Sequence, residues 1–242
     1  MKQAITITAR MKSTRLPLKV MRYIEGYPMI EHMIDRLKTS HNADMVILCT
    51  SIDPQDDILV DVAEKKEIEH FRGSKEDVLD RLYHAAQAFH VDFIASTTAD
   101  NPLADAIHLD KLIDTYQHTK ADYITTMGLP LGTYGYGLKI TTLGDIIASK
   151  SETDTEIWGH FFEKNPQVKK IDLPVEPLLR HPEMRLTVDE EPDLKLMRHI
   201  FHHFYPTNPH FTLPQVVTYL LENPELLEIN KNVQHWSTQK KK

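Results

Sequence analysis

The sequence has one cysteine and no long apolar run, and each shortage excludes a class of protein. Cys49 is the single cysteine among 242 residues, so an intrachain disulfide and a metal site built from cysteines are both excluded. No stretch approaches the roughly eighteen apolar residues that a membrane span needs. The first ten residues are too polar for the apolar core of a signal peptide. We therefore expect a cytoplasmic protein without a membrane partner.

Basic residues are also fewer than acidic ones. The chain has 28 Lys and Arg against 35 Asp and Glu, which gives a formal net charge of −7. The longest basic run, Lys240–Lys242, stands at the extreme end of the sequence. Proteins that bind nucleic acid usually carry net positive charge or a long basic stripe. Nucleic acid is therefore not expected as a partner.

Strand patterns and helix patterns alternate through the first half of the chain. Buried strands are expected at Ala4–Thr8, Met45–Thr50, Ile68–Phe71, Asp92–Thr97 and Tyr123–Thr126. Amphipathic helices are expected at Pro28–Ser40, Ile58–Lys66, Glu76–Phe89 and Ala106–Gln117, with Ser74 and Asp77 forming an N-cap pattern before the third. This alternation predicts an α/β fold in which a mostly parallel sheet is sandwiched by helices.

The pattern loosens after Gly128. Strands are expected at Leu138–Thr141 and Met184–Val188, and helices at Asp193–Tyr205 and Phe211–Leu227. We interpret residues 1–242 as one domain with a first half (1–127), a second half (128–205) and a helical tail (206–242). The apolar residues of the tail either pack on the chain's own core or build a homodimer.

The loop after the first strand is the most basic part of the chain. Ligands of an open parallel sheet bind beyond the carboxyl ends of its strands, which is where Ala9–Lys19 lies. This loop carries Arg10, Lys12, Arg15 and Lys19 with no acidic residue. Guanidinium groups bind phosphate oxygens, so the loop indicates a triphosphate site, with a merely solvated basic loop as the alternative. Its lack of glycine excludes the usual dinucleotide-binding and P-loop patterns.

Two aspartates are expected at the ends of later strands. Asp100 follows the strand Asp92–Thr97, and Asp189 follows Met184–Val188. An ordinary turn at Asn101-Pro102 and helix capping by Glu190 and its neighbours explain the surrounding residues equally well. A pair of carboxylates that faces a cationic loop is nevertheless the arrangement that metal-assisted phosphoryl-type transfer needs.

Four stretches together resemble the cytidylyltransferase family of the spore-coat-polysaccharide type, which is related to the acylneuraminate and 3-deoxy-manno-octulosonate cytidylyltransferases. Ala9–Lys19 is similar to the family's A-R-M-G-S-T-R-L-P-G-K, and Phe71–Arg81 to F-R-G-S-x-x-D-V-L-D-R. Ala99–Leu103 resembles x-G-D-x-P-L, and Arg185–Leu194 resembles R-L-T-V-D-T-P-E-D-L. The similarity runs over nearly the whole chain.

The resemblance implies a nucleotide-diphospho-sugar transferase (GT-A-like) fold, CTP as the donor and Mg²⁺ as the cofactor, in the synthesis of surface-polysaccharide precursors. It makes 1–127 the nucleotide-binding half and 128–205 the acceptor and lid half. The residues that it implies fall into three groups: Ala9, Arg10, Ser13, Arg15 and Lys19 for the triphosphate; Asp100 and Asp189 for the metal; and Thr50, Ser51, Arg72, Gly73 and Ser74 for the base and ribose. Arg10, Arg15, Lys19, Asp100 and Asp189 would be the catalytic residues. A nucleotidyltransferase that uses another nucleotide, and a non-catalytic nucleotide-binding protein, are the alternatives.

The acceptor side departs from the family pattern. Gly137–Thr141 resembles a family stretch G-L-D-x-E, but both acids are lost and Lys139 stands in place of the first. Glu156-Ile157-Trp158-Gly159 stands where the family more often has Glu-His-x-Thr-Pro. We therefore expect a small anionic, sugar-acid or phosphorylated acceptor, bound by Lys139 and Glu156.

Overall fold

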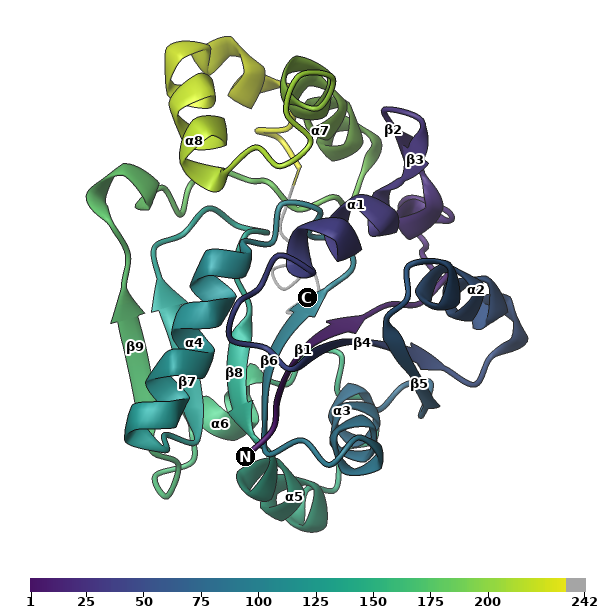
Figure 1. Ribbon diagram of the computed structural model, residues 1–242, viewed down its shortest axis with the longest axis vertical. Coiled ribbons are helices and arrows are strands. Elements are labelled where there is room, and N and C mark those ends of the chain that lie inside the picture. The colour runs from purple at the N-terminus through teal and green to yellow at the C-terminus, as the bar shows by residue number, and fades with distance from the viewer. Residues whose placement is uncertain (234–242) are drawn as a thin grey trace.

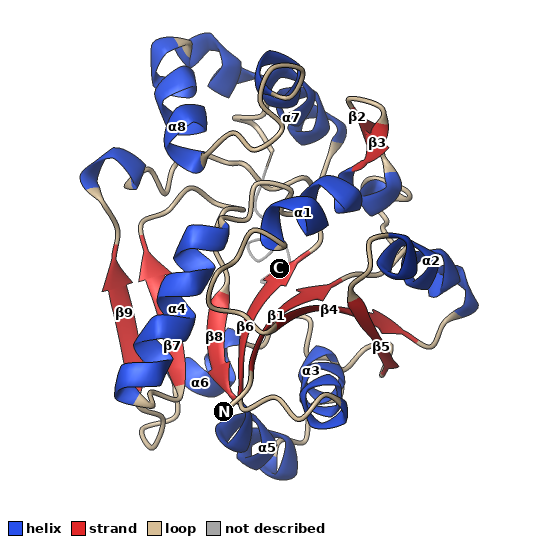
Figure 2. Cartoon of the chain, viewed as in Figure 1, coloured by secondary structure: helices blue, strands red, loops and turns tan. Residues whose placement is uncertain are grey.

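A seven-stranded sheet is the centre of the computed structural model, which describes residues 1–233. Its strand order is β5-β4-β1-β6-β8-β7-β9, and β8 alone runs antiparallel to its neighbours (Figure 2). The strands are β1 (Gln3–Thr8), β4 (Met45–Ser51), β5 (Glu69–Gly73), β6 (Phe93–Thr98), β7 (Tyr123–Met127), β8 (Tyr136–Lys139) and β9 (Lys170–Pro174). The carboxyl ends of six strands therefore lie at one edge of the sheet.

Helices cover both faces of this sheet, as Figures 1 and 2 show. Because side chains alternate along a strand, Ile5 and Ile7 of β1 pack with one set of helices, and Ala4 packs with the other. The first set is α1 (Met29–Leu37), α2 (Asp57–Lys65) and α4 (Ala106–Thr119). The second is α3 (Val78–Ala88), α5 (Ile140–Ser149) and α6 (Gly159–Glu163). The predicted sandwich is confirmed.

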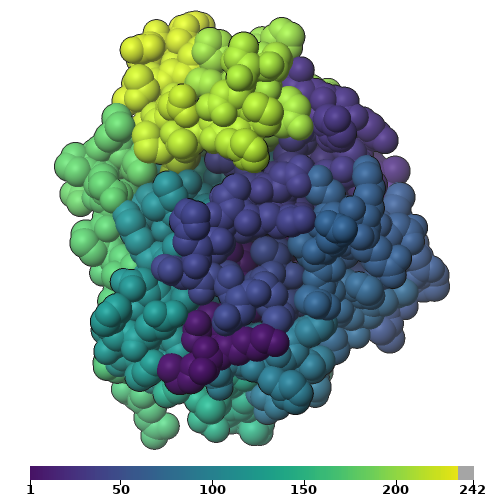
Figure 3. Space-filling model, viewed as in Figure 1, coloured from purple at the N-terminus to yellow at the C-terminus, as the bar shows by residue number. Residues whose placement is uncertain are grey.

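A third apolar cluster lies beyond the carboxyl ends of the strands, at the top of Figure 1. It is built by α7 (Glu191–Phe204), α8 (Leu213–Glu222) and a 3₁₀ helix, Pro224–Ile229, together with the hairpin of β2 (Tyr23–Ile24) and β3 (Tyr27–Pro28). In the space-filling view, the yellow-green tail at the top adjoins the violet-blue residues of α1 (Figure 3), where Arg36 donates to the Phe211 carbonyl at 2.8 Å. The buried side chains of Val216, Val217 and Leu220 show that the tail packs on the chain's own core. The remainder of the predicted tail, with Lys240–Lys242, lies outside the described residues.

Several predicted boundaries differ from the structure. Met184–Val188 is extended but forms only an isolated bridge, between Arg185 and Leu131, because it crosses over the strand ends instead of joining the sheet. The strand expected at Leu138–Thr141 ends at Lys139, and α5 begins at Ile140. Asp77, not Ser74, is the N-cap of α3. The edge strand β9 was not predicted, since only alternate residues in it are even partly buried.

None of the helices within residues 1–233 is both long and apolar enough to cross a membrane. The two predicted halves share one sheet, because β7 of the first half pairs in parallel with β9 of the second.

The crossing segment 184–189 is packed tightly against a glycine turn, which generates a stability prediction. Gly132 has a φ of +95°, and a Cβ built on it would lie 2.4 Å from the backbone nitrogen of Thr187. Gly26 has a similar φ of +85° but has nothing within 4 Å of its Cβ position. We expect Gly132→Ala to lower the free energy of unfolding by about 2 kcal/mol more than Gly26→Ala does, because only the former adds a backbone clash to the left-handed strain. Urea denaturation of both variants measures this, and equal losses would show that the turn tolerates the methyl group.

Candidate active site

The structure brings Asp100 and Asp189 together beyond the carboxyl end of β6. Asp100 stands two residues after β6, and the crossing segment places Asp189 beside it. The Val188 N–H donates a hydrogen bond of 2.8 Å to the Asp100 carbonyl, and the Thr187 hydroxyl donates to the same oxygen at 3.3 Å. The backbone itself therefore fixes the spacing of the two aspartates.

The Lys19 ammonium lies between these two carboxylates. Its Nζ is 3.0 Å from Asp100 Oδ2 and 2.9 Å from Asp189 Oδ1. Burial alone would lower the pKa of Lys19, but the charges of Asp100 and Asp189 outweigh it and raise the pKa above the ordinary 10.5. Lys19 therefore stays protonated at this edge at neutral pH.

Asp189 is surrounded by cations. Besides Lys19, it pairs with Arg15 Nη2 at 2.8 Å through Oδ1 and with Arg185 Nη2 at 2.8 Å through Oδ2. Burial alone would raise the pKa of Asp189, but the charges of Lys19, Arg15 and Arg185 outweigh it and lower the pKa below 3.8. Asp189 is therefore ionised at neutral pH, as a carboxylate ligand of a metal ion must be, and the cations around it would attract phosphate groups.

Arg10 is not part of this cluster. Its guanidinium turns toward the start of α3, where Nη1 donates to the Lys75 carbonyl at 2.6 Å and pairs with Glu76 at 3.1 Å. Its Nη2 is 3.4 Å from Glu156 Oε1. Four of the predicted catalytic residues, Arg15, Lys19, Asp100 and Asp189, therefore form one cluster. The fifth, Arg10, lies apart from it beside Glu156, which was predicted for the acceptor.

The residues expected around the base lie at the ends of β4 and β5. Thr50 and Ser51 pair in register with Arg72 and Gly73. The Arg72 Nε donates to the Ser51 carbonyl at 3.0 Å, and the Ser51 hydroxyl donates to Asp56. The Thr50 hydroxyl oxygen is buried without a hydrogen-bond partner. The structure thus brings this group together, with the Ser51 hydroxyl already engaged.

The remaining predicted residues of this edge have structural contacts. The Ala9 N–H donates to the Cys49 carbonyl at 3.1 Å, which extends the β1–β4 ladder by one residue. The Ser13 hydroxyl accepts a hydrogen bond from the Leu16 N–H at 3.4 Å, and the Ser74 hydroxyl accepts one from Asp77 at 3.1 Å. These contacts shape the two loops.

Two buried arginines of the site were not predicted as site residues. Arg81 is 1% exposed and donates to the Ser74 carbonyl at 2.6 Å, so it supports the loop at the end of β5. Arg185 pairs with Asp189 and with Asp193 at 2.9 Å. Both stand inside the motifs quoted above, but a sequence does not show which arginine of a motif is buried.

Lys139 lies at the wrong edge of the sheet for its predicted role. It pairs in register with Phe93, the first residue of β6, whereas Asp100 follows the last. At about 3.3 Å per residue, the two positions are about 20 Å apart. The Lys139 ammonium pairs instead with Asp122 at 3.0 Å. The structure therefore argues against acceptor binding by Lys139, because β8 runs antiparallel and carries its last residue away from the Asp100–Asp189 cluster.

Asp100 and Asp189 offer carboxylate oxygens that fit a magnesium ion. Within residues 1–233, no group of three or more His, Cys, Asp and Glu side chains is placed to hold a metal. Mg²⁺ commonly binds one or two carboxylates and completes its shell with substrate phosphates and water. The donor set therefore fits a metal that arrives with a phosphorylated substrate.

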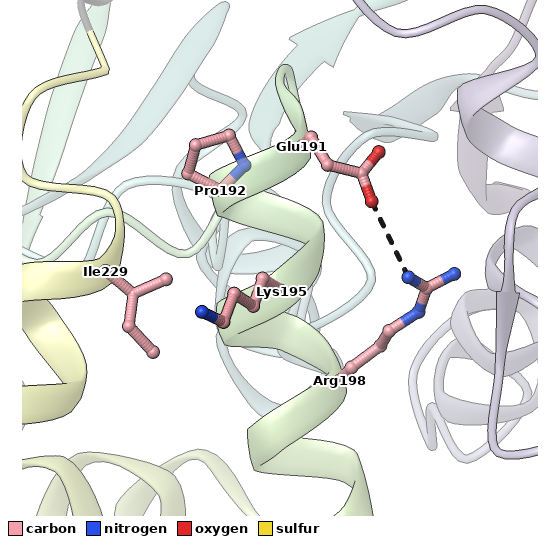
Figure 4. A pocket seen from close by; sticks show the side chains of 5 residues that line it. All are labelled: Glu191, Pro192, Lys195, Arg198 and Ile229. Atoms are coloured by element: carbon pink, nitrogen blue, oxygen red, sulfur yellow. Dashed lines mark ion pairs between the residues drawn. The ribbon is translucent and has the colours of Figure 1, made fainter.

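A hollow of about 520 Å³ lies beside the first turns of α7, as Figure 4 shows. Its lining contains Glu191 and Arg198, which pair at 3.6 Å, and none of the Asp100–Asp189 cluster. The hollow therefore lies apart from the candidate site, which is marked by the charged residues around Asp100 and Asp189.

The pairing of Asp189 predicts a pH-dependent contribution to stability. Because its folded pKa is lowered, the stabilisation is complete above the unfolded value near 3.9 and is lost as the pH falls through the folded pKa. Asp189→Asn should cost about 3 kcal/mol at pH 6, since it leaves the surrounding cations unpaired, and the difference from wild type should shrink below about pH 4. Denaturant titrations between pH 3 and 7 measure it, with the exposed Asp61→Asn on α2 as a control. A constant difference across this range would contradict the assignment.

Comparison with known proteins agrees with the motifs and with the fold. Residues 4–146 match the family profile described as cytidylyltransferase. The chain is 30% identical over 233 residues to an uncharacterized protein of Methanocaldococcus jannaschii, covering 96% of this chain and 95% of that protein. It is 29% identical over 226 residues to the spore coat polysaccharide biosynthesis protein SpsF of Bacillus subtilis, covering 90% and 94%.

A solved structure of a cytidylyltransferase from Leptospira borgpetersenii superposes with a TM-score of 0.87 at 25% identity, covering 97% of this chain and 100% of that one. The predicted nucleotidyltransferase architecture is thereby confirmed. Since the profile spans more than half of the chain and a relative aligns over nearly the whole of both proteins, this chain belongs to the cytidylyltransferase family.

Proposed function

We propose that the protein transfers the cytidylyl group of CTP to a small anionic, sugar-acid or phosphorylated acceptor and releases pyrophosphate, as a step in making surface-polysaccharide precursors. The observation that carries the proposal is the meeting of Asp100, Asp189 and the Arg15–Lys19 loop at the carboxyl edge of the sheet. Family membership supports CTP as the donor. The printed role of the Bacillus relative supports a polysaccharide precursor as the product.

The order of the strands supports the following arrangement of the substrates. The ends of β4 and β5, with Ser51 and Arg72, would hold the base and ribose, and the loop after β1 would hold the triphosphate. Asp100, after β6, marks the α-phosphate. The acceptor is expected near the predicted residue Glu156, which contacts Arg10 and follows Thr155, whose N–H donates to the Glu76 carbonyl beside the start of α3.

The chemistry follows from these charges. An acceptor oxygen forms a bond to the α-phosphorus in line with the breaking bond to pyrophosphate. Arg15 and Lys19 neutralise the charge that develops on the leaving pyrophosphate, and Arg10 orients the phosphates from the other side. Asp100 and Asp189 would hold Mg²⁺, which when bound supplies further positive charge at the α-phosphate.

The first test is pyrophosphate release with a panel of CTP, UTP, GTP and ATP and of sugar-acid and phosphorylated acceptors. We expect CTP to be preferred, and Asp100→Asn to lower the rate at least about 100-fold by removing transition-state stabilisation. Asp61→Asn on the exposed side of α2 is the matched control. Preference for another nucleotide would reassign the donor, and full activity of folded Asp100→Asn would refute the site.

The acceptor assignment has its own test. Glu156→Gln should raise the acceptor KM about 10- to 150-fold, which corresponds to the loss of one hydrogen bond to a charged group. Lys139→Gln, at the opposite edge, should leave it unchanged. The measurement is steady-state kinetics of both variants with the acceptor that the panel identifies. A raised acceptor KM in Lys139→Gln and an unchanged one in Glu156→Gln would restore Lys139 as the acceptor residue.

A further inference from the structure

The Lys19 ammonium stands where the two metal-binding carboxylates of the proposed function converge. Its distances of 3.0 Å to Asp100 Oδ2 and 2.9 Å to Asp189 Oδ1 mean that these oxygens are at most about 6 Å apart. Mg²⁺ binds oxygen at about 2.0–2.1 Å. An ion that touches both oxygens would therefore need the position that the ammonium fills.

Both carboxylates are held by contacts that do not involve Lys19. Asp100 Oδ1 accepts a hydrogen bond from the Thr98 hydroxyl. Asp189 Oδ2 pairs with Arg185, and the Asp189 N–H donates to Asp193 Oδ2 at 2.9 Å. The two acids would therefore keep their places if the Lys19 side chain moved away.

The Lys19 side chain can leave this position, and bound phosphates would attract it. It opens a single-turn 3₁₀ helix, Lys19–Met21, directly after the exposed Pro17 and Leu18. Its side chain is a point charge on a flexible stem. Arg15, which is joined to the same Asp189 oxygen at 2.8 Å, brings a second cation to the loop that would hold the phosphates. A bound triphosphate would thus offer Lys19 anions close to those that it leaves.

We propose that Lys19 and a divalent cation are alternative occupants of one position between Asp100 and Asp189, and that nucleotide phosphates draw Lys19 out of it. The inference rests on the proposed function, in which Asp100 and Asp189 bind the metal. It adds that the nucleotide frees the position that the metal takes. Without a nucleotide, Lys19 competes with the metal. With a nucleotide, Lys19 moves to the phosphates and frees the carboxylates. Metal and nucleotide binding are then positively coupled, and each strengthens the other by the same factor.

The test is Mn²⁺ binding to the full chain without nucleotide, followed by electron paramagnetic resonance. We expect Lys19→Met to bind Mn²⁺ at least about tenfold more tightly than the wild type, because the competing ammonium is gone. Lys12→Met removes the same charge from an exposed position of the same loop and should change the affinity less than about twofold. Asp100→Asn added to Lys19→Met should abolish the gain.

Three results would overturn the exchange: no gain in Lys19→Met, an equal gain in Lys12→Met, or a gain that survives Asp100→Asn. Circular dichroism melting checks that each variant is folded, and Lys19→Gln replaces Lys19→Met if the latter is not. The outcome is separable from the proposed function. Pyrophosphate release from CTP without an Mn²⁺ gain leaves the function and removes the exchange, whereas an Mn²⁺ gain without activity on any nucleotide does the opposite.

Discussion

The carboxylate of Asp189 connects the loop after β1 with the segment 184–189 that crosses over the strand ends. One oxygen forms ion pairs with Arg15 and Lys19 of the loop after β1, and the other forms an ion pair with Arg185 of the crossing segment. A charge as buried as this one is tolerable only with close partners of opposite sign. The loop and the crossing segment are therefore held in one arrangement, and each depends on the other.

The same segment joins the site to the apolar cluster above the sheet. Leu186 and Val188 are buried in that cluster, while Arg185, Thr187 and Asp189 between them make the polar contacts. Asp193, at the start of α7, binds Arg185, and the Asn230 side chain donates to Asp193 at 2.9 Å and to the Arg185 carbonyl at 3.0 Å. The tail thus stabilises the segment that carries Asp189, so packing far from the proposed phosphate site helps to fix a proposed catalytic carboxylate.

The predicted site residues lie in two groups because they follow different strands of the sheet. Asp100 and Lys19 lie over β1 and β6, whereas Ser51 and Arg72 lie over β4 and β5. Arg10 reaches from the first group toward the second and meets the Lys75 carbonyl. A nucleotide is long enough to need both, with its base over one pair of strands and its phosphates over the other. The spacing of the groups is therefore what the proposed reaction requires.

The sequence by itself determined the sheet and its helices, because period-two runs such as Ile5–Ile7 and the apolar faces of α1 and α3 are local signals. It also indicated Lys19 and Asp100 as candidates because they follow strands, and Asp189 as a candidate although the segment before it is not a strand. Only the tertiary structure decided that 184–188 is a crossing segment and that β8 is antiparallel, since strand patterns do not encode partners or direction. For the same reason Lys139 was misplaced, Arg81 and Arg185 were missed, and the Lys19 ammonium was found between two carboxylates far away in the sequence. Contacts of this kind depend on how distant segments pack, which no local pattern records.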